Sequence, residues 1–133
     1  MNSKLLKSIE GLNADQNFAV GNDLVFIPDF KHSLTPLFKN KVYTSAEIAY
    51  CERFDDSLLR YASTWAAKEA VYKAIKQIDP SALSWLKIEV IREKTGGRPR
   101  VVFHHSPANP FRVSLTLSHD GDYAWAIAIA ELR

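Results

Sequence analysis

The sequence predicts a single α+β domain in which a largely antiparallel sheet packs on one long buried helix. A strand-like segment at 18–27 is followed by a long, alanine-rich helical pattern at about 56–78. Four further strand-like segments then come in two pairs, and each pair is joined by a turn that contains glycine. Strands that split around helices and end in hairpins are typical of α+β domains, and 133 residues provide room for one core.

The domain is expected to begin after a polar N-terminal extension. Residues 1–16 carry only a weak helical pattern, which leaves 17–133 as the single domain. The first strand, FAVGNDLVFI at 18–27, is rich in the β-branched and apolar residues that strands favour. Pro28 ends this strand because proline lacks the backbone N–H that a strand ladder needs.

Helical signals occupy the stretch that follows. Residues 29–41 form a short helix or loop that Pro36 interrupts. Thr44 followed by Glu47 fits a capping box, in which each side chain binds the backbone N–H of the other residue, and it predicts a helix to about Arg53. The long helix comes next and ends at an Asp-Pro dipeptide.

The remaining segments alternate apolar and polar residues in the manner of half-buried strands. The expected pairs are 85–93 with 99–105 and 111–118 with 123–131, joined by turns at 94–97 and 119–122.

Charge, cysteine content and hydropathy narrow the function classes. A net charge of +2 and a pI near 8.7 describe a mildly basic protein without the Lys/Arg block typical of nucleic-acid binders. The single cysteine, Cys51, is expected to be a small buried residue, and its inability to form an internal disulfide favours a reducing compartment. No apolar run approaches the roughly 20 residues that span a bilayer, and the N-terminus lacks a signal-peptide core. We therefore expect a cytoplasmic protein that binds neither nucleic acid nor membrane.

The long helix carries the first candidate for chemistry. Its apolar residues spread over nearly the whole circumference, which predicts burial on most sides. Glu69, Lys73 and Lys76 nevertheless gather in one narrow arc, with Glu69 and Lys73 four residues apart on one face. A solvent-exposed Glu-Lys pair explains this arc equally well. The flanking alanines favour a site, because small residues let a ligand approach and buried charges need a partner.

The first strand carries the second candidate, Asp23, because aspartate is disfavoured inside strands. One interpretation is a Gly-Asn-Asp turn between two short strands. The other is a carboxylate held on a rigid element and facing a second carboxylate. Two carboxylates and phosphate oxygens form a good Mg²⁺ site, since this ion keeps several waters. A lysine beside them would neutralise charge that develops on phosphate.

Taken in order, these residues resemble the holo-acyl-carrier-protein synthase family, the short single-domain 4′-phosphopantetheinyl transferases. The resemblance runs from about Val20 to the C-terminus. It is carried by Gly21-Asn-Asp-Leu-Val25, Thr44-x-x-Glu47, Trp65-Ala-Ala-Lys-Glu-Ala-Val-Tyr-Lys-Ala74, Ile88-Glu-Val90, Gly97-Arg-Pro99, Ser114-Leu-Thr-Leu-Ser-His-Asp120 and Asp122-Tyr-Ala124.

The resemblance implies a fold, a reaction and partners. The fold would be that of the 4′-phosphopantetheinyl transferases. The reaction would be Mg²⁺-dependent transfer of 4′-phosphopantetheine from coenzyme A to a serine of apo acyl carrier protein, with release of 3′,5′-ADP, in support of fatty acid biosynthesis. The protein would be a homotrimer with a site at each subunit interface.

The resemblance also implies roles for the charged residues of the first strand and the long helix. Asp23 and Glu69 would ligate Mg²⁺, and Glu69 would act as the general base for the serine hydroxyl, directly or through water. Lys73 would pair with the phosphate and stabilise the charge passing to the leaving group. Lys68 would either assist this lysine or support the helix.

Four further residues would form the nucleotide pocket. Arg98 and His119 would contact the ribose 3′-phosphate, Pro99 would lie against adenine, and Ser118 would line the pocket. Without the resemblance, Arg98 and His119 are better explained as turn residues, with Arg98 exposed.

Two positions depart from the family pattern. Many members carry arginine where this chain has Asp29 and Thr64. Both changes leave the proposed metal ligands and base intact but affect coenzyme and carrier-protein contacts. Basic residues nearby, at Lys31, Lys39 and Lys41, either supply replacement charge or form a solvated edge.

The sequence therefore predicts an active transferase. The alternative is a non-catalytic module that binds carrier protein or coenzyme A, but such a module has no need of a pair of metal ligands.

Overall fold

A computed structural model describes residues 17–93, 97–104 and 110–133. The expected N-terminal extension, most of the turn at 94–97 and the last residue of the strand at 99–105 lie outside the described residues. The elements are β1 (Phe18–Phe26), α2 (Ile27–Ser33), α3 (Pro36–Val42), α4 (Ser45–Glu52), α5 (Ser57–Ile78), the 3-10 helix η1 (Trp85–Lys87), β2 (Ile88–Ile91), β3 (Arg100–Phe103), β4 (Phe111–Asp120) and β5 (Tyr123–Leu132).

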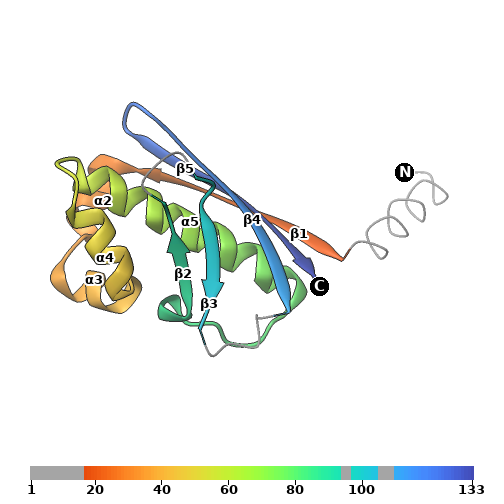
Figure 1. The fold of residues 1–133 in the computed structure, drawn as a ribbon. Coiled ribbons are helices and arrows are strands. Elements are labelled where there is room, and N and C mark those ends of the chain that lie inside the picture. Colours follow the sequence, from red (N-terminus) through yellow and green to blue (C-terminus); the bar gives the residue numbers. More distant parts are fainter. Residues whose placement is uncertain (1–16, 94–96, 105–109) are drawn as a thin grey trace.

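The strands form two antiparallel sheets, of which the larger has the order β1-β5-β4 and the smaller pairs β2 with β3. In Figure 1, α5 lies between these two sheets, and the short helices α2, α3 and α4 gather near one end of α5. The predicted α+β class with antiparallel pairing is therefore confirmed. The division into two sheets is new, because alternation along a strand does not say which other strands it joins.

The first strand is continuous. β1 pairs with β5 along its whole length, and the partner of Asp23 is Ala126. Residues of β1 alternate between exposed and buried, and Asp23 is on the buried face together with Gly21. The alternative of a Gly-Asn-Asp turn between two short strands is therefore wrong.

Helix α5 packs very closely on the inner face of β1. A Cβ atom on Gly21 would lie 2.0 Å from the carbonyl oxygen of Ala70 and 2.8 Å from the backbone nitrogen of Ala74. Only glycine fits there, because the obstructing atoms are backbone and have no rotamer to change. Alanines at 62, 66, 67, 70 and 74 are fully buried, as the apolar circumference of the helix predicts. This close contact fixes the position of α5 relative to Asp23.

Helix α4 begins where its sequence predicts, but strand β2 begins later than its alternating pattern predicts. The capping box at the start of α4 is present: Glu47 accepts from the backbone N–H of Thr44, and the Thr44 side chain accepts from that of Glu47. The expected strand at 85–93 is shorter, because Trp85 begins a 3-10 turn and the strand starts at Ile88. Trp85 is half-buried there and packs on the rings of two α5 residues, Trp65 and Tyr72.

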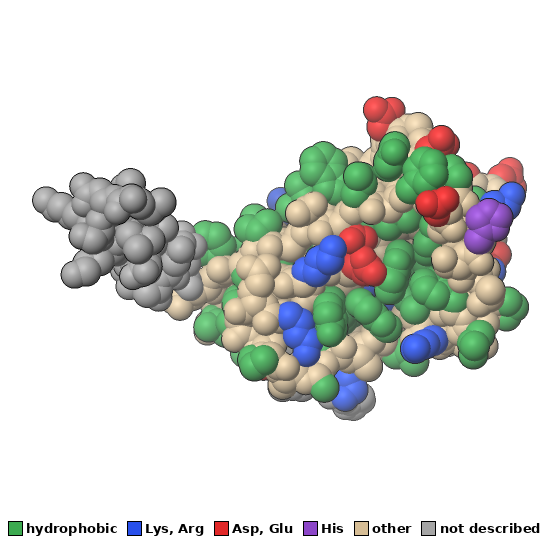
Figure 2. All heavy atoms as spheres, turned by 180° about the vertical axis from the view of Figure 1, so that it is seen from behind, with side chains coloured by type: hydrophobic (Ala, Val, Ile, Leu, Met, Phe, Trp, Pro, Cys, Tyr) green, Lys and Arg blue, Asp and Glu red, His purple; other side chains and the backbone are tan. Residues whose placement is uncertain are grey.

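The second face of the large sheet is exposed and largely apolar. Its exposed apolar side chains come from both β1 and β5: Phe18, Val20, Leu24, Phe26, Tyr123, Trp125 and Ile129. Figure 2 shows the molecule from behind, with hydrophobic side chains spread over its surface and a basic and an acidic side chain side by side near the middle. In the described part of the chain, no helix combines the length and apolar character that a membrane crossing requires.

Candidate active site

The structure brings one residue of β1 together with two residues of α5 that lie far from it in the sequence. Asp23 projects from the inner face of β1, and its carboxylate oxygen lies 2.8 Å from the ammonium nitrogen of Lys73. The same ammonium donates to the backbone carbonyl of Asn22 at 3.3 Å. Glu69, one turn before Lys73 on α5, is close enough to Asp23 for the Asp23 carboxylate to raise its pKa. The two predicted metal ligands and the predicted lysine therefore form one cluster.

The electrostatics of this cluster show two carboxylates in competition. Burial raises the pKa of Glu69 to about 7, and the hydrogen bond with Asp23 and the negative charge of Asp23 add to the rise. The Lys73 ammonium opposes this shift only in part. The hydrogen bond to Asp23 in turn raises the pKa of Lys73. One lysine thus compensates only part of two converging negative charges, and near neutral pH the pair readily holds a proton or a cation.

The residues present fit a divalent cation of the Mg²⁺ type. Among the described residues, no group of three or more Asp, Glu, His or Cys side chains is arranged to hold a metal. Two carboxylates are sufficient for Mg²⁺, which dehydrates reluctantly and completes its shell with waters and phosphate oxygens. Asp23 is largely buried on a rigid strand, so its carboxylate has little freedom to turn away.

Lys68 belongs to a different structure. Its ammonium is fully buried and lies 2.6 Å from the Glu47 carboxylate, on the side of α5 that faces α4. The second oxygen of Glu47 accepts from the backbone N–H of Val90 at 2.8 Å. This ion pair connects α4, α5 and β2, so of the two roles predicted for Lys68 the structure assigns support of the helix.

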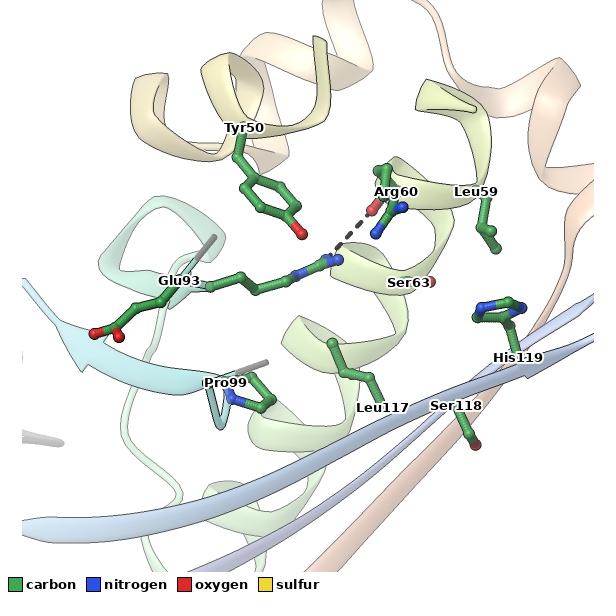
Figure 3. Close-up of a pocket in the computed structure, with 11 residues that line it drawn as sticks. Tyr50, Leu59, Arg60, Ser63, Glu93, Pro99, Leu117, Ser118 and His119 are labelled. Carbon is green, nitrogen blue, oxygen red and sulfur yellow. Dashed lines mark hydrogen bonds between the residues drawn. The ribbon is translucent and has the colours of Figure 1, made fainter. Parts of the chain in front are cut away.

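A cavity of about 260 Å³ gathers three of the four residues predicted for the nucleotide. It lies between α4, α5 and β4, and its lining includes Pro99, Ser118 and His119 (Figure 3). The imidazole of His119 is on the α5 side of β4, whereas the Ser118 hydroxyl points away from the cavity. Arg98 does not line this cavity but a neighbouring groove between β3 and β4, together with Arg100.

The cavity also contains residues that sequence reasoning missed. Tyr50, Arg60 and Arg92 line it from α4, α5 and the end of β2. The guanidinium of Arg92 donates to the hydroxyl of Thr64 and to the backbone carbonyl of Arg60. Arg92 is 28 residues from Thr64 and 32 residues from Arg60 in the sequence. Contacts at such separations leave no periodic pattern in the sequence.

The acidic cluster and the cavity lie on opposite flanks of α5 in one chain. Asp23 is on β1 and His119 is on β4, and these strands are the two edges of a sheet with β5 between them. Ser63 in the cavity and Glu69 in the cluster are six residues apart on α5, which separates their directions by roughly 120°. Asp23, Glu69 and Lys73 do not line the cavity. A ligand enclosed in the cavity of one described chain therefore does not reach that chain's acidic cluster directly.

Comparison with known sequences gives consistent matches over most of the chain. The model of the 4′-phosphopantetheinyl transferase superfamily matches residues 19–128. The holo-acyl-carrier-protein synthase of Koribacter versatilis is 38% identical over 120 residues, covering 84% of this chain and 95% of that protein. The synthase of Chlorobaculum tepidum is 38% identical over 117 residues, covering 86% and 98%. The fatty acid synthase subunit alpha of Lachancea kluyveri is 34% identical over a match 136 residues long that covers 97% of this chain and 7% of that protein.

Solved structures give the same result. The complex of ACPS with CoA from Chronobacterium ammoniagenes has a TM-score of 0.75 at 28% identity, and the match covers 87% of this chain and 98% of that one. The acyl carrier protein synthase of Mycobacterium tuberculosis has a TM-score of 0.68 at 32% identity, with 86% and 97% covered.

Proposed function

Because the chain belongs to the holo-acyl-carrier-protein synthase family of 4′-phosphopantetheinyl transferases, we propose that it transfers 4′-phosphopantetheine from coenzyme A to a serine of apo acyl carrier protein and releases 3′,5′-ADP. The observation that carries this proposal is the convergence of Asp23, Glu69 and Lys73 across β1 and α5. A module that only binds carrier protein or coenzyme has no use for two carboxylates kept in this unfavourable proximity.

Glu69 is suited to remove the serine proton. Serine is a weak nucleophile until a base takes its proton, and a general base works best when its pKa is near the working pH. In the metal-free site, burial raises the pKa of Glu69 to about 7. A bound Mg²⁺ would lower this pKa, and Glu69 would then accept the proton directly or through one water molecule. Asp23 has a positioning role, since its charge and hydrogen bond help to set the pKa of Glu69.

Lys73 is suited to hold the phosphate that is attacked and to stabilise the charge that passes to the leaving nucleotide. Phosphoryl transfer depends on alignment and charge stabilisation more than on covalent help from the protein. The raised pKa of Lys73 keeps its ammonium charged at any working pH. Asp23 and Glu69 would hold the Mg²⁺, which when bound neutralises charge on the diphosphate of coenzyme A.

A homotrimer with sites at the subunit interfaces accounts for two features of the isolated chain. The first is the exposed apolar face of the large sheet, where Leu24 is 59% exposed and Trp125 is 45% exposed. Such a surface is typical of interfaces between subunits. The second is the separation of the acidic cluster from the cavity, which a neighbouring subunit can overcome by placing its cavity against the cluster.

Mixing two impaired variants tests this shared site. Glu69→Gln removes the base and His119→Ala alters the cavity, so each homotrimer should transfer slowly. Unfolding and refolding them together should restore activity, because mixed trimers contain interfaces with both wild-type halves. Activity no higher than that of the separate variants would contradict a site shared between subunits.

The carrier protein is proposed to serve fatty acid biosynthesis in the cytoplasm. The match to a segment of a fatty acid synthase subunit supports this assignment. The buried thiol of Cys51, whose pKa burial raises to about 11, is inert and compatible with a reducing compartment.

The decisive experiment is direct. The protein is incubated with coenzyme A, Mg²⁺ and apo acyl carrier protein, and the carrier is weighed by mass spectrometry. We expect a mass increase of one phosphopantetheine, which removal of Mg²⁺ or the Glu69→Gln substitution prevents. Binding of carrier or coenzyme without any mass increase would overturn the proposal in favour of a non-catalytic module.

A further inference from the structure

We propose that the Arg92 guanidinium binds the ribose 3′-phosphate of coenzyme A. This inference rests on the proposed function, because coenzyme A is the proposed donor substrate. It replaces the sequence expectation that Arg98 makes this contact.

Arg92 is held in the cavity by neutral groups. Its guanidinium donates to the Thr64 hydroxyl and, at 3.4 Å, to the backbone carbonyl of Arg60 (dashed line in Figure 3). It also lies over the ring of Tyr50, 4.9 Å from the ring centre. These contacts fix the direction of the side chain but leave its positive charge uncompensated.

No carboxylate in the described part of the chain forms a salt bridge with Arg92. Glu93 lines the same cavity, but its carboxylate points away in Figure 3 and lies 3.8 Å from Arg100. The other guanidinium of the cavity, that of Arg60, already lies 3.3 Å from Asp56. A half-buried cation without a counter-ion favours an anionic ligand, and the planar guanidinium matches a phosphate group with two parallel hydrogen bonds.

The side chains of Thr64 and Arg92 are in direct contact. The Thr64 hydroxyl donates to the carbonyl of Arg60 at 2.8 Å and accepts from Arg92, so the Arg92 guanidinium lies directly at the end of the Thr64 side chain. An arginine at 64 would direct its own guanidinium into this region. The short threonine leaves room for a guanidinium that enters from the end of β2 instead.

The place of the cavity indicates which phosphate it receives. The acidic cluster of Asp23 and Glu69 is the proposed site of the metal and therefore of the diphosphate. The remaining phosphate of coenzyme A is the one on the ribose 3′-oxygen. The cavity holds Arg92 and His119 but neither acid of the cluster, so it suits a lone phosphate monoester.

Calorimetric binding of 3′,5′-ADP and 5′-AMP to the full chain, without metal, tests the assignment. The two ligands differ only in the 3′-phosphate. For the wild type we expect tighter binding of 3′,5′-ADP. For Arg92→Ala we expect the affinity for 3′,5′-ADP to fall about 10- to 100-fold, which is the usual effect of losing a hydrogen bond to a charged group. The affinity of this variant for 5′-AMP should change little. An unchanged preference for 3′,5′-ADP in Arg92→Ala, or no preference in the wild type, would overturn the assignment.

Arg53→Ala is the matched control, because Arg53 lies over the same Tyr50 ring at 5.2 Å but does not line the cavity. It should keep the wild-type preference. A second variant, Thr64→Arg combined with Arg92→Ala, should regain most of the lost affinity by supplying the guanidinium from α5. If Arg92→Ala does not fold, Arg92→Lys keeps the charge without the planar fork and should bind 3′,5′-ADP more weakly than the wild type.

Kinetics separate this inference from the proposed function. Arg92→Ala should raise KM for coenzyme A but leave KM for 3′-dephospho-coenzyme A unchanged. Absence of transfer by the wild type would refute the proposed function, yet the binding of 3′,5′-ADP would still decide the role of Arg92.

Discussion

Replacement of Glu69 by Gln should stabilise the metal-free protein above neutral pH although it abolishes turnover. In the folded protein, burial and the Asp23 carboxylate raise the pKa of Glu69 from 4.5 to about 7. Between these two pH values the folded state keeps a proton that the unfolded state has released. The free energy of unfolding therefore falls as pH rises through this window, and glutamine removes the effect because it carries no charge.

The size of the effect follows from the shift. A rise of about 2.5 units in the pKa corresponds to roughly 3 kcal/mol at pH values well above 7. The Glu69 side chain is only half-buried, and solvent screens the repulsion between the carboxylates, so we expect about 1–2 kcal/mol in practice.

Urea unfolding at pH 5 and at pH 8 measures this difference. The protein concentration is kept fixed, since subunit assembly also shifts apparent stability. In EDTA, the variant and the wild type should be similar at pH 5, and the variant should be more stable at pH 8. Added Mg²⁺ should stabilise the wild type more than the variant. Asp55→Asn, which removes an exposed carboxyl, is the control and should change neither comparison.

Two outcomes would refute the reasoning. One is a wild-type stability that does not fall relative to Glu69→Gln between pH 5 and pH 8. The other is full transferase activity in the variant, which would remove Glu69 from the mechanism altogether.

Three further substitutions test other parts of the structure. Asp23→Asn should lower the pKa of Glu69, measured by NMR titration of its carboxyl, but leave it above 4.5 because burial is the larger cause; an unchanged pKa would contradict the contact. Lys68→Met should lower the free energy of unfolding by about 3 kcal/mol, measured in urea, because it leaves the buried Glu47 carboxylate without its cation; a neutral effect would show that the backbone N–H donors to Glu47 suffice. Gly21→Ala should destabilise by about 3 kcal/mol or more, since the new methyl group meets the backbone of α5; wild-type stability in thermal unfolding would contradict that packing.

Local signals were sufficient for much of the architecture. The capping box at Thr44 and Glu47, the alternation along the strands and the long alanine-rich helix all concern residues within a few positions of one another. Interactions at such short range depend little on the rest of the fold, so they can be predicted from the order of residues. Trp85 is the exception. It packs against α5 and begins a 3-10 turn where the sequence predicted the first residues of a strand.

The candidate cluster was predictable in its composition but not in its geometry. The sequence alone identified Asp23, Glu69 and Lys73 as unusual charges on otherwise apolar elements, and the family resemblance assigned roles to them. Only the close contact of Gly21 with α5 brings Asp23 to the side chains 46 and 50 positions later. Tertiary structure alone placed Lys68 on Glu47, Arg92 beside Thr64 and the cavity on the flank opposite the acids. These arrangements depend on contacts between distant segments, whose partners are chosen by packing and charge across the whole fold rather than by any local pattern.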